Sequence, residues 1–298
     1  GCGALWWDRD RSAEQVPDLL RRRSLLRVGR MRADTVKIML DGVAESRTAA
    51  MISPYLDGCA CATAHSGTSF VDPDELRGYV TELDALGFQV HFHALGDRAV
   101  RDALDAVDAA RTTNGFRDTR PHLAHLQVVD PGDIPPVSAR SASRPTCNRC
   151  GQPTSRRWTN SPFRSSGTNA PVGSIPSVPC CARAQRWQPA ATGRSAAPTR
   201  STASMSRSNR VLPGRDGQGR PVFLPEQRID LTAALTAYTA GSAYVNHLDD
   251  TGSIEVGKLA DLVVLDRDPF TETADAIGET RAVLTYVGGD RVYTAPDA

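Results

Sequence analysis

The sequence contains no apolar run near the length of a membrane-spanning helix, which takes roughly 18 or more residues. It also has no N-terminal basic region followed by a short apolar stretch, the pattern of a secretory signal. Its seven cysteines are an odd number without even spacing, which argues against the disulfide framework of a small secreted domain. These absences predict a cytoplasmic protein with no membrane partner.

A further absence is local. Between Pro136 and Ser208 the chain has no Asp, Glu, Lys or Leu, yet it has eleven arginines. Because the net charge of the whole chain is +1, the remaining residues carry −10. A stretch so rich in Ser, Arg, Pro and Thr buries too little apolar surface to offset its ordering entropy, so we expect it to be disordered. The chain therefore divides into 1–135, an aberrant low-complexity segment at 136–208, and 209–298.

The first of these ranges alternates between strand-like and helix-like patterns. Short apolar runs at 36–40, 88–95 and 122–129 predict three buried strands. Between the first two runs, Asp72 and Pro73 precede two more acidic residues and predict the start of a helix. A second amphipathic stretch separates the last two runs. Strand, helix, strand, helix, strand predicts a parallel fold of the α/β class.

The last range also has the pattern of a folded unit. Residues 231–246 are amphipathic and predict a helix that starts near Asp230 and weakens at Gly241. Apolar runs at 262–266 and 282–287 predict two strands of a small β-unit.

Four histidines fall on two of the predicted strands. His91 and His93 are two residues apart and point to the same face, whereas His122 and His125 are three apart and face opposite ways. His93 and His125 lie near the C-terminal ends of neighbouring strands, where the active sites of parallel folds are built. Imidazoles at such positions bind a metal such as zinc at about 2 Å. The alternative is that each is a hydrogen-bonded core histidine.

Lys37 lies inside an apolar strand, where an unpaired ammonium group is costly. Three arrangements relieve that cost: the side chain extends to the strand end, it pairs with Asp41, or it is chemically modified. Without further information, a lysine that reaches solvent is the preferred interpretation.

Several motifs together resemble the YtcJ-like branch of the amidohydrolase superfamily, also called amidohydrolase family 3. The segments that carry the resemblance are TVKIMLDGV, FQVHFHALGDRAV, RPHLAHLQVVDPGDIP and GSIEVGKLADLVVLDRDPF. The likeness covers about 1–135 and 209–298, with the motifs in the family's order.

The resemblance implies a (β/α)8 barrel, here partial, with a remnant of an accompanying β-sandwich. It implies hydrolysis of C–N bonds in small amide-type substrates with one or two divalent metals, typically zinc. By the same resemblance His93 and His125 are metal ligands from strands 5 and 6 of the family's barrel. Lys37 corresponds to a position that can be a carboxylated lysine bridging two metals, which would remove its positive charge.

The family also has residues that this sequence lacks. No His-x-His pair of the first barrel strand precedes Lys37, so we expect strands 1–3 to be absent. No Asp-containing motif of the last strand precedes the NRVLPG segment at 209–214. GC-rich codons for 190–206, read two bases later, give an SDWP motif like that of the family, which indicates a frameshift across the middle segment. The catalytic residue is therefore unknown, and we expect activity to be impaired or lost.

Two alternatives belong to other functional classes. One is a non-catalytic remnant or scaffold. The other is a zinc- and nucleic-acid-binding module in the middle segment, where Cys147 and Cys150 form a C-x-x-C pair among the arginines. Against the module, the later Cys180 and Cys181 are a poor ligand pair, and no histidine falls in the segment. We therefore expect no nucleic-acid partner, and the sequence leaves the oligomeric state open.

Overall fold

The computed structural model describes residues 1–133, 144–146, 230–272 and 276–296. The chain forms two compact units, the first containing the described residues up to 146 and the second those from 230 onward. The predicted boundaries at 135–136 and 208–209 fall outside the described residues. The predicted disorder and frameshift of the middle segment also concern residues that lie almost entirely outside them, so both stay predictions.

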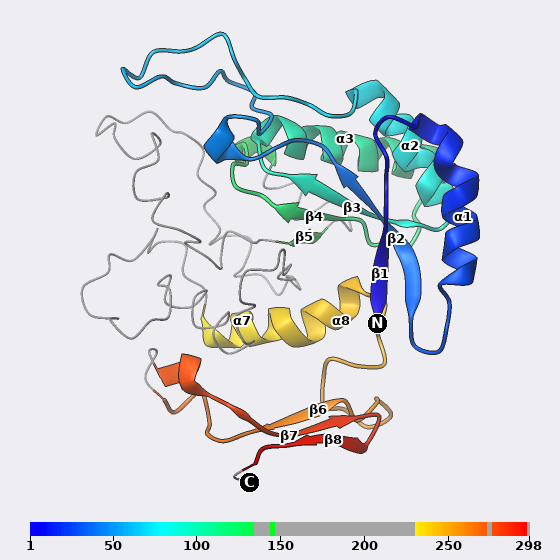
Figure 1. Ribbon diagram of the computed structural model, residues 1–298, viewed down its shortest axis with the longest axis vertical. Helices are drawn as coiled ribbons and strands as arrows, with labels where there is room; N and C mark the ends of the chain where they lie inside the picture. Colours follow the sequence, from blue (N-terminus) through cyan, green and yellow to red (C-terminus); the bar gives the residue numbers. More distant parts are fainter. Residues whose placement is uncertain (134–143, 147–229, 273–275, 297–298) are drawn as a thin grey trace. The chain divides into compact units, whose positions relative to one another are not determined.

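The first unit is built on a five-stranded parallel sheet whose strands follow one another in chain order (Figure 1). Its strands are β1 (Cys2–Trp6), β2 (Arg32–Met39), β3 (Gln89–Ala94), β4 (His122–His125) and β5 (Arg144–Thr146). The three predicted strands correspond to β2, β3 and β4, so the predicted parallel α/β fold is confirmed. β1 and β5 have no counterpart in the prediction, and β5 is the only described part of the middle segment.

Three α-helices connect the strands and pack on the sheet. They are α1 (Val16–Leu25), α2 (Pro73–Ala85) and α3 (Asp97–Asn114), with the short 3-10 turns η1 (Ser12–Gln15), η2 (Ala44–Ser46) and η3 (Pro131–Asp133). α2 and α3 lie side by side against β3, whereas α1 lies against β1 and β2. The Asp72 carboxylate accepts hydrogen bonds from the N–H groups of Asp74 and Glu75, which caps α2 and confirms its predicted start.

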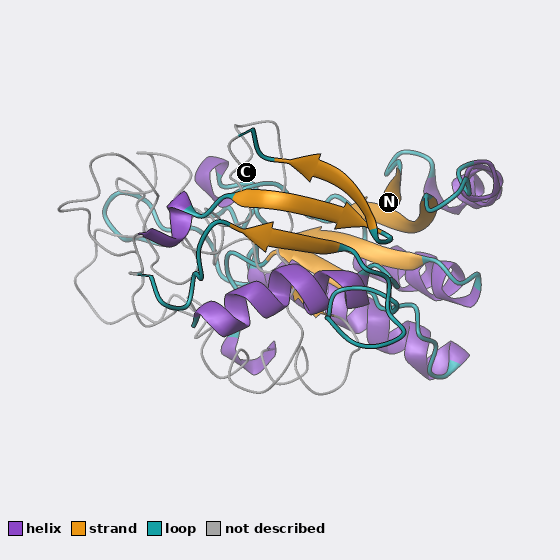
Figure 2. Ribbon diagram, turned by 90° about the horizontal axis from the view of Figure 1, so that it is seen from below, coloured by secondary structure: helices purple, strands orange, loops and turns teal. Residues whose placement is uncertain are grey.

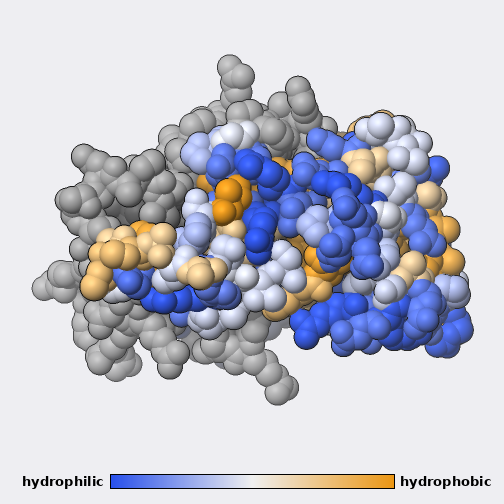
Figure 3. All heavy atoms as spheres, turned by 90° about the horizontal axis from the view of Figure 1, so that it is seen from above, coloured by the Kyte–Doolittle hydropathy of each residue, from blue (hydrophilic) through white to orange (hydrophobic). Residues whose placement is uncertain are grey.

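A continuous apolar core lies between the sheet and these helices. Phe88 and Phe92 are its largest fully buried side chains. Aliphatic residues of α2 and α3 surround them, among them Leu76, Leu83, Val100 and Val107. On the face seen in Figure 3, hydrophilic side chains cover much of the described surface, with apolar patches between them. Among the described helices, none is long and apolar enough to cross a membrane.

The second unit contains one interrupted helix and a three-stranded antiparallel sheet (Figure 2). Its elements are α7 (Leu231–Thr236), the π-helical turn η8 (Ala237–Gly241), α8 (Ser242–Val245), β6 (Leu262–Leu265), the 3-10 turn η9 (Ala276–Glu279), β7 (Ala282–Val287) and β8 (Asp290–Thr294). The Asp230 side chain caps α7 by accepting a hydrogen bond from Ala233 N, which confirms the predicted start. Gly288 and Gly289, both with positive φ, form the tight turn between β7 and β8.

Candidate metal centre at the strand ends

Ionisable side chains gather where β2, β3 and β4 lie next to one another. The strand register places Lys37 of β2 beside His91 of β3, and His91 beside His122 of β4. The ring centroids of His91 and His122 are 4.2 Å apart. Because paired residues of neighbouring parallel strands point to the same face, these three side chains form one layer.

A second layer lies nearer the C-terminal ends of the strands. His93 follows His91 by two residues and shares its face, as the alternation of an extended strand predicts. The ring centroid of His93 is 4.4 Å from that of His125, and the two rings meet edge to face. The structure therefore brings together the two histidines that the resemblance implies as metal ligands.

The orientation of His125 corrects a sequence-based expectation. His122 and His125 were expected on opposite faces of β4, yet both rings contact histidines of β3. The cause lies in the backbone, because φ is +81° at His125 and +47° at Leu126, so the chain leaves the extended conformation there. Positive φ is uncommon outside glycine, and such strained residues cluster at functional sites. The same change ends β4 at His125, short of the predicted end at residue 129.

Burial keeps these histidines uncharged. Loss of solvation lowers the pKa of His93 to about 4, and the nearby charge of Lys37 acts in the same direction. Loss of solvation also lowers the pKa of His125 to about 3, with smaller contributions from His93 and Lys37. The pKa of His91 falls far below its usual range, again mainly through burial. At neutral pH each imidazole therefore keeps a lone pair, the form that binds a metal.

Lys37 is the side chain of the cluster whose charge is least offset by its surroundings. Its Nζ is buried and has no hydrogen-bond partner among the described residues. Loss of solvation lowers the pKa of Lys37 from 10.5 to about 7. The interpretation of Lys37 as a lysine that reaches solvent is therefore wrong. No ion pair with Asp41 replaces that contact in the described structure, so chemical modification stays a prediction.

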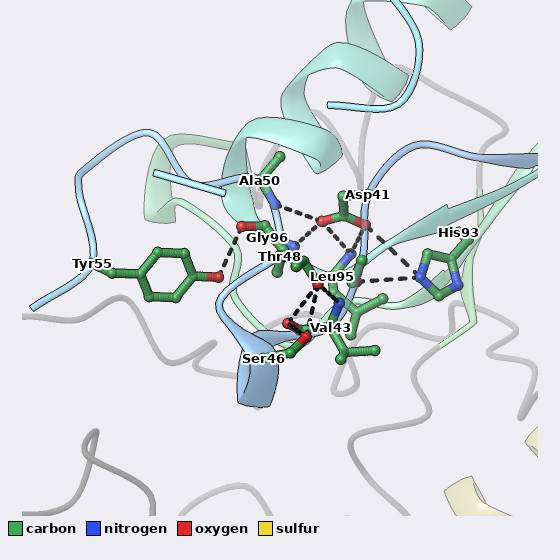
Figure 4. A network of polar contacts seen from close by, with 11 residues as sticks. Asp41, Val43, Ser46, Thr48, Ala50, Tyr55, His93, Leu95 and Gly96 are labelled. Carbon is green, nitrogen blue, oxygen red and sulfur yellow. Dashed lines mark hydrogen bonds and ion pairs between the residues drawn. The ribbon is translucent and has the colours of Figure 1, made fainter. Parts of the chain in front are cut away.

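Asp41 lies two residues beyond the end of β2 and is completely buried. Its carboxylate accepts hydrogen bonds from the backbone N–H groups of Ala50, Leu95 and Gly96 (Figure 4). Burial raises the pKa of Asp41 to about 6, while these three hydrogen bonds oppose the rise. Sequence reasoning considers Asp41 only as a partner for a lysine. It misses the anchoring role because two of the three donors come from a distant part of the chain.

The donor set fits part of a metal site. Two neutral imidazoles in contact supply nitrogen ligands, and the unpartnered amine of Lys37 lies in the neighbouring layer. Within the described ranges, no group of three or more His, Cys, Asp or Glu side chains is placed to hold a metal ion. The segment where an Asp of the last barrel strand is expected, 190–206, lies outside those ranges. A complete site therefore needs donors beyond the His93–His125 pair.

Parallel strands joined by helices, with ionisable side chains near their C-terminal ends, form the α/β architecture in which sites lie at the strand ends. The sequence profile of the amidohydrolase family matches residues 15–293, which is most of the chain. The chain therefore belongs to the amidohydrolase family. Its α/β fold is the partial barrel that the resemblance implies.

Three curated relatives support this assignment. Protein LONG AFTER FAR-RED 3 of Arabidopsis thaliana is 26% identical over 265 residues, and N-substituted formamide deformylase of Arthrobacter pascens is 25% identical over 274. YtcJ of Bacillus subtilis (strain 168) is 24% identical over 278 residues, which supports the YtcJ-like resemblance. Each match covers 87% of this chain and 42%, 45% and 46% of the relative, respectively. The chain thus spans about half the length of the curated relatives it matches.

A solved structure gives the same result. The crystal structure of an uncharacterized metal-dependent hydrolase from Pyrococcus furiosus is similar, with a TM-score of 0.64 and 25% sequence identity. The similarity covers 86% of this chain and 50% of that chain. The amidohydrolase family is metal-dependent and hydrolyses C–N bonds, so the histidine pair lies in a fold suited to metal chemistry.

Proposed function

We propose that this chain forms part of a zinc-dependent hydrolase that cleaves the C–N bond of small, non-peptide amides. The observation that carries the proposal is the contact between the rings of His93 and His125 at the ends of adjacent parallel strands. Membership of the amidohydrolase family supports the reaction class. The name of the Arthrobacter pascens relative, a deformylase of N-substituted formamides, supports the bond type.

In this proposal His93 and His125 each give one ring nitrogen to the metal, and Lys37 gives oxygen as a carbamate. A buried amine with a pKa of about 7 is partly neutral at physiological pH, and the neutral amine is the form that reacts with carbon dioxide. The carbamate replaces an uncompensated buried cation with an anion that a metal neutralises. This accounts for a lysine Nζ without a partner in the interior of the sheet.

A bound divalent metal supplies an acidified water molecule and polarises the amide carbonyl. Cleavage of the C–N bond also needs a protein group that accepts a proton and returns it to the leaving amine. The segment 136–208, where the family's last-strand Asp is expected, contains neither Asp nor Glu. We therefore propose that metal binding persists while turnover is impaired, with a non-catalytic remnant as the limiting case.

The other functional class receives less support. The C-x-x-C pair of the zinc- and nucleic-acid-binding alternative lies outside the described residues, and it stays the weaker prediction. We propose a cytoplasmic setting, which is consistent with the thiols of Cys59 and Cys61, because these form no disulfide.

Metal analysis of the purified chain tests the proposal. Zinc content after dialysis and zinc affinity by competition with a chelator are measured for the wild type and for His93→Gln, His125→Gln and His65→Gln. His65 is a matched control because its ring is exposed in a loop, with its Nε2 against the carbonyl oxygen of Arg47. We expect stoichiometric zinc in the wild type and the control, and at least tenfold weaker binding in both other variants.

Turnover is followed with a panel of N-substituted formamides. Weak, zinc-dependent hydrolysis that both ligand variants abolish supports an impaired hydrolase. Zinc binding without hydrolysis shows that the chain is a non-catalytic remnant. A wild type that binds no zinc contradicts the proposal as a whole.

A further inference from the structure

Asp41 is a completely buried carboxylate that the proposed ligand set does not use. Its Oδ1 accepts a hydrogen bond from Leu95 N at 3.0 Å, and its Oδ2 accepts from Ala50 N at 3.0 Å and Gly96 N at 2.8 Å. Leu95 and Gly96 follow β3, whereas Ala50 belongs to the loop between β2 and α2. One side chain thus joins the ends of two neighbouring strands and a loop (Figure 4).

The joined segments touch one another directly. A Cβ atom at Gly96 would lie 1.9 Å from the carbonyl oxygen of Ala50, so a glycine is required for this approach. The same carbonyl accepts a hydrogen bond from Arg98 N at 3.2 Å, and the Asp97 carboxylate accepts one from Ile52 N at 2.7 Å. The loop is therefore fixed to the beginning of α3, and Asp41 ties this junction to the end of β2.

The same segment supports the chain where it leaves β4. Leu126 N donates to the carbonyl of Ala94 at 3.0 Å, and the N–H two residues further on donates to the carbonyl of Leu95 at 2.9 Å. These bonds hold the backbone at the point where His125 adopts its positive φ. Because Asp41 fixes Leu95, it also fixes the turn that aims His125 at the other histidine.

The ring of His93 faces Asp41 as well. Its Nε2 lies 3.4 Å from the carbonyl oxygen of Gly42 and 4.0 Å from Oδ1 of Asp41. A carbonyl oxygen only accepts hydrogen bonds, so this contact is a hydrogen bond in the tautomer that carries its hydrogen on Nε2. The Nδ1 of the neutral ring then keeps its lone pair and is the nitrogen left for a ligand.

We propose that Asp41 is a positioning residue for the histidine pair. It fixes the segment whose Gly42 carbonyl oxygen faces Nε2 of His93, and it fixes the orientation of His125 through Leu95. Groups around a metal site that orient its histidine ligands sustain metal affinity. The part of this inference that concerns metal rests on the proposed function, whereas the part that concerns the tautomer and the orientation does not.

The variant that tests the inference is Asp41→Asn, which keeps the size of the side chain. The carboxylate accepts hydrogen bonds through both oxygens, whereas an amide has one acceptor oxygen and one NH2 group. In Asp41→Asn that NH2 group would face backbone N–H donors, so the junction must rearrange. Asp84→Asn is the matched control, since Asp84 is also buried and accepts hydrogen bonds from Thr119 and Asn114. Thr119 and Asn114 lie before the start of β4, whereas His125 is its last residue. The control substitution is therefore expected to leave the contact between His93 and His125 unchanged.

The first measurement is the tautomer of His93 in metal-free protein labelled with 15N-histidine. Long-range 15N–1H correlation spectra distinguish Nε2–H from Nδ1–H, and His93→Gln identifies the signal. We expect Nε2–H in the wild type and in Asp84→Asn, and a mixture of tautomers in Asp41→Asn. An Nδ1–H tautomer in the wild type overturns the inference, whatever the behaviour of Asp41→Asn. If Asp41→Asn does not fold, Asp41→Ser, which is smaller and keeps one acceptor, is measured instead.

The second measurement is zinc affinity, for which we expect Asp41→Asn to bind about 10–100-fold more weakly than Asp84→Asn. An Asp41→Asn protein with the wild-type tautomer and a zinc affinity within threefold of the control shows that Asp41 is only a structural anchor. A wild type without zinc affinity contradicts the proposed function alone, because the tautomer measurement still decides the role of Asp41.

Discussion

Replacement of Lys37 by methionine tests whether a buried, uncompensated charge limits the stability of this protein. Methionine has a similar length and volume, but it has no charge and no hydrogen-bond donor to leave unsatisfied. Nζ of Lys37 has no partner among the described residues, so the substitution removes no hydrogen bond that these residues make. Lys37→Met should therefore stabilise the fold wherever the lysine would be charged.

The magnitude follows from the pKa of Lys37, which burial lowers from 10.5 to about 7. That difference corresponds to about 5 kcal/mol, at about 1.36 kcal/mol for each pH unit. Between pH 7 and 10.5 the unfolded chain holds a proton that the folded chain releases, so the stability of the wild type rises with pH. Below about pH 7 both states are protonated at this site, and the full cost is present.

The assay is urea unfolding of both proteins in buffer free of carbon dioxide. Lys37→Met should be more stable by up to about 5 kcal/mol at pH 6 and by under about 1 kcal/mol at pH 10. A difference that does not change with pH would refute the reasoning. If Lys37 forms a carbamate, added bicarbonate at pH 8 should stabilise the wild type and leave Lys37→Met unchanged.

Two further substitutions probe the packing around the site. Phe92→Ala should lower the free energy of unfolding by about 3–5 kcal/mol, because Phe92 is fully buried in the apolar core. Phe116→Ala, at an exposed ring, should change it by less than about 1 kcal/mol, and equal effects in urea unfolding would contradict the assigned core. Gly96→Ala should cost about 1–3 kcal/mol or more, because the new Cβ meets the Ala50 carbonyl. Gly78→Ala, in open space within α2, should instead stabilise by about 0.5–1 kcal/mol, and thermal melting of the pair checks the contrast.

The strands that sequence patterns predict are those whose segments contain short apolar runs. β2, β3 and β4 carry such runs in the first unit, and the exposed β6 and the half-buried β7 carry them in the second. β1 lacks this signal, since its segment Cys2–Trp6 contains a glycine and is exposed at several positions. It becomes a strand only because β2 offers an edge to pair with. β8 is similar, because all its residues are exposed and its pairing with β7 decides its structure.

For the candidate site, alternation correctly places His93 and fails for His125. The face of His93 follows from the regular geometry of β3, which is local to the sequence. The positive φ of His125 instead depends on hydrogen bonds from the β4 exit to the end of β3, which no local pattern encodes. The role of Asp41 is also non-local, because Gly96 lies 55 residues away in the chain. The family resemblance names the ligand positions, but only the fold shows what orients them.

The strand order of the first unit allows the sheet to grow while the chain is being synthesised. β2, β3 and β4 each pair with the strand made just before them, so none must wait for a later segment. Ribosomes add roughly 5–20 residues per second, which is slow compared with the closure of such local connections. His93 and His125 belong to β3 and β4, which are both made by residue 125 of the 298-residue chain. Synthesis therefore delivers both histidines of the pair before any residue of the second unit from 230 onward.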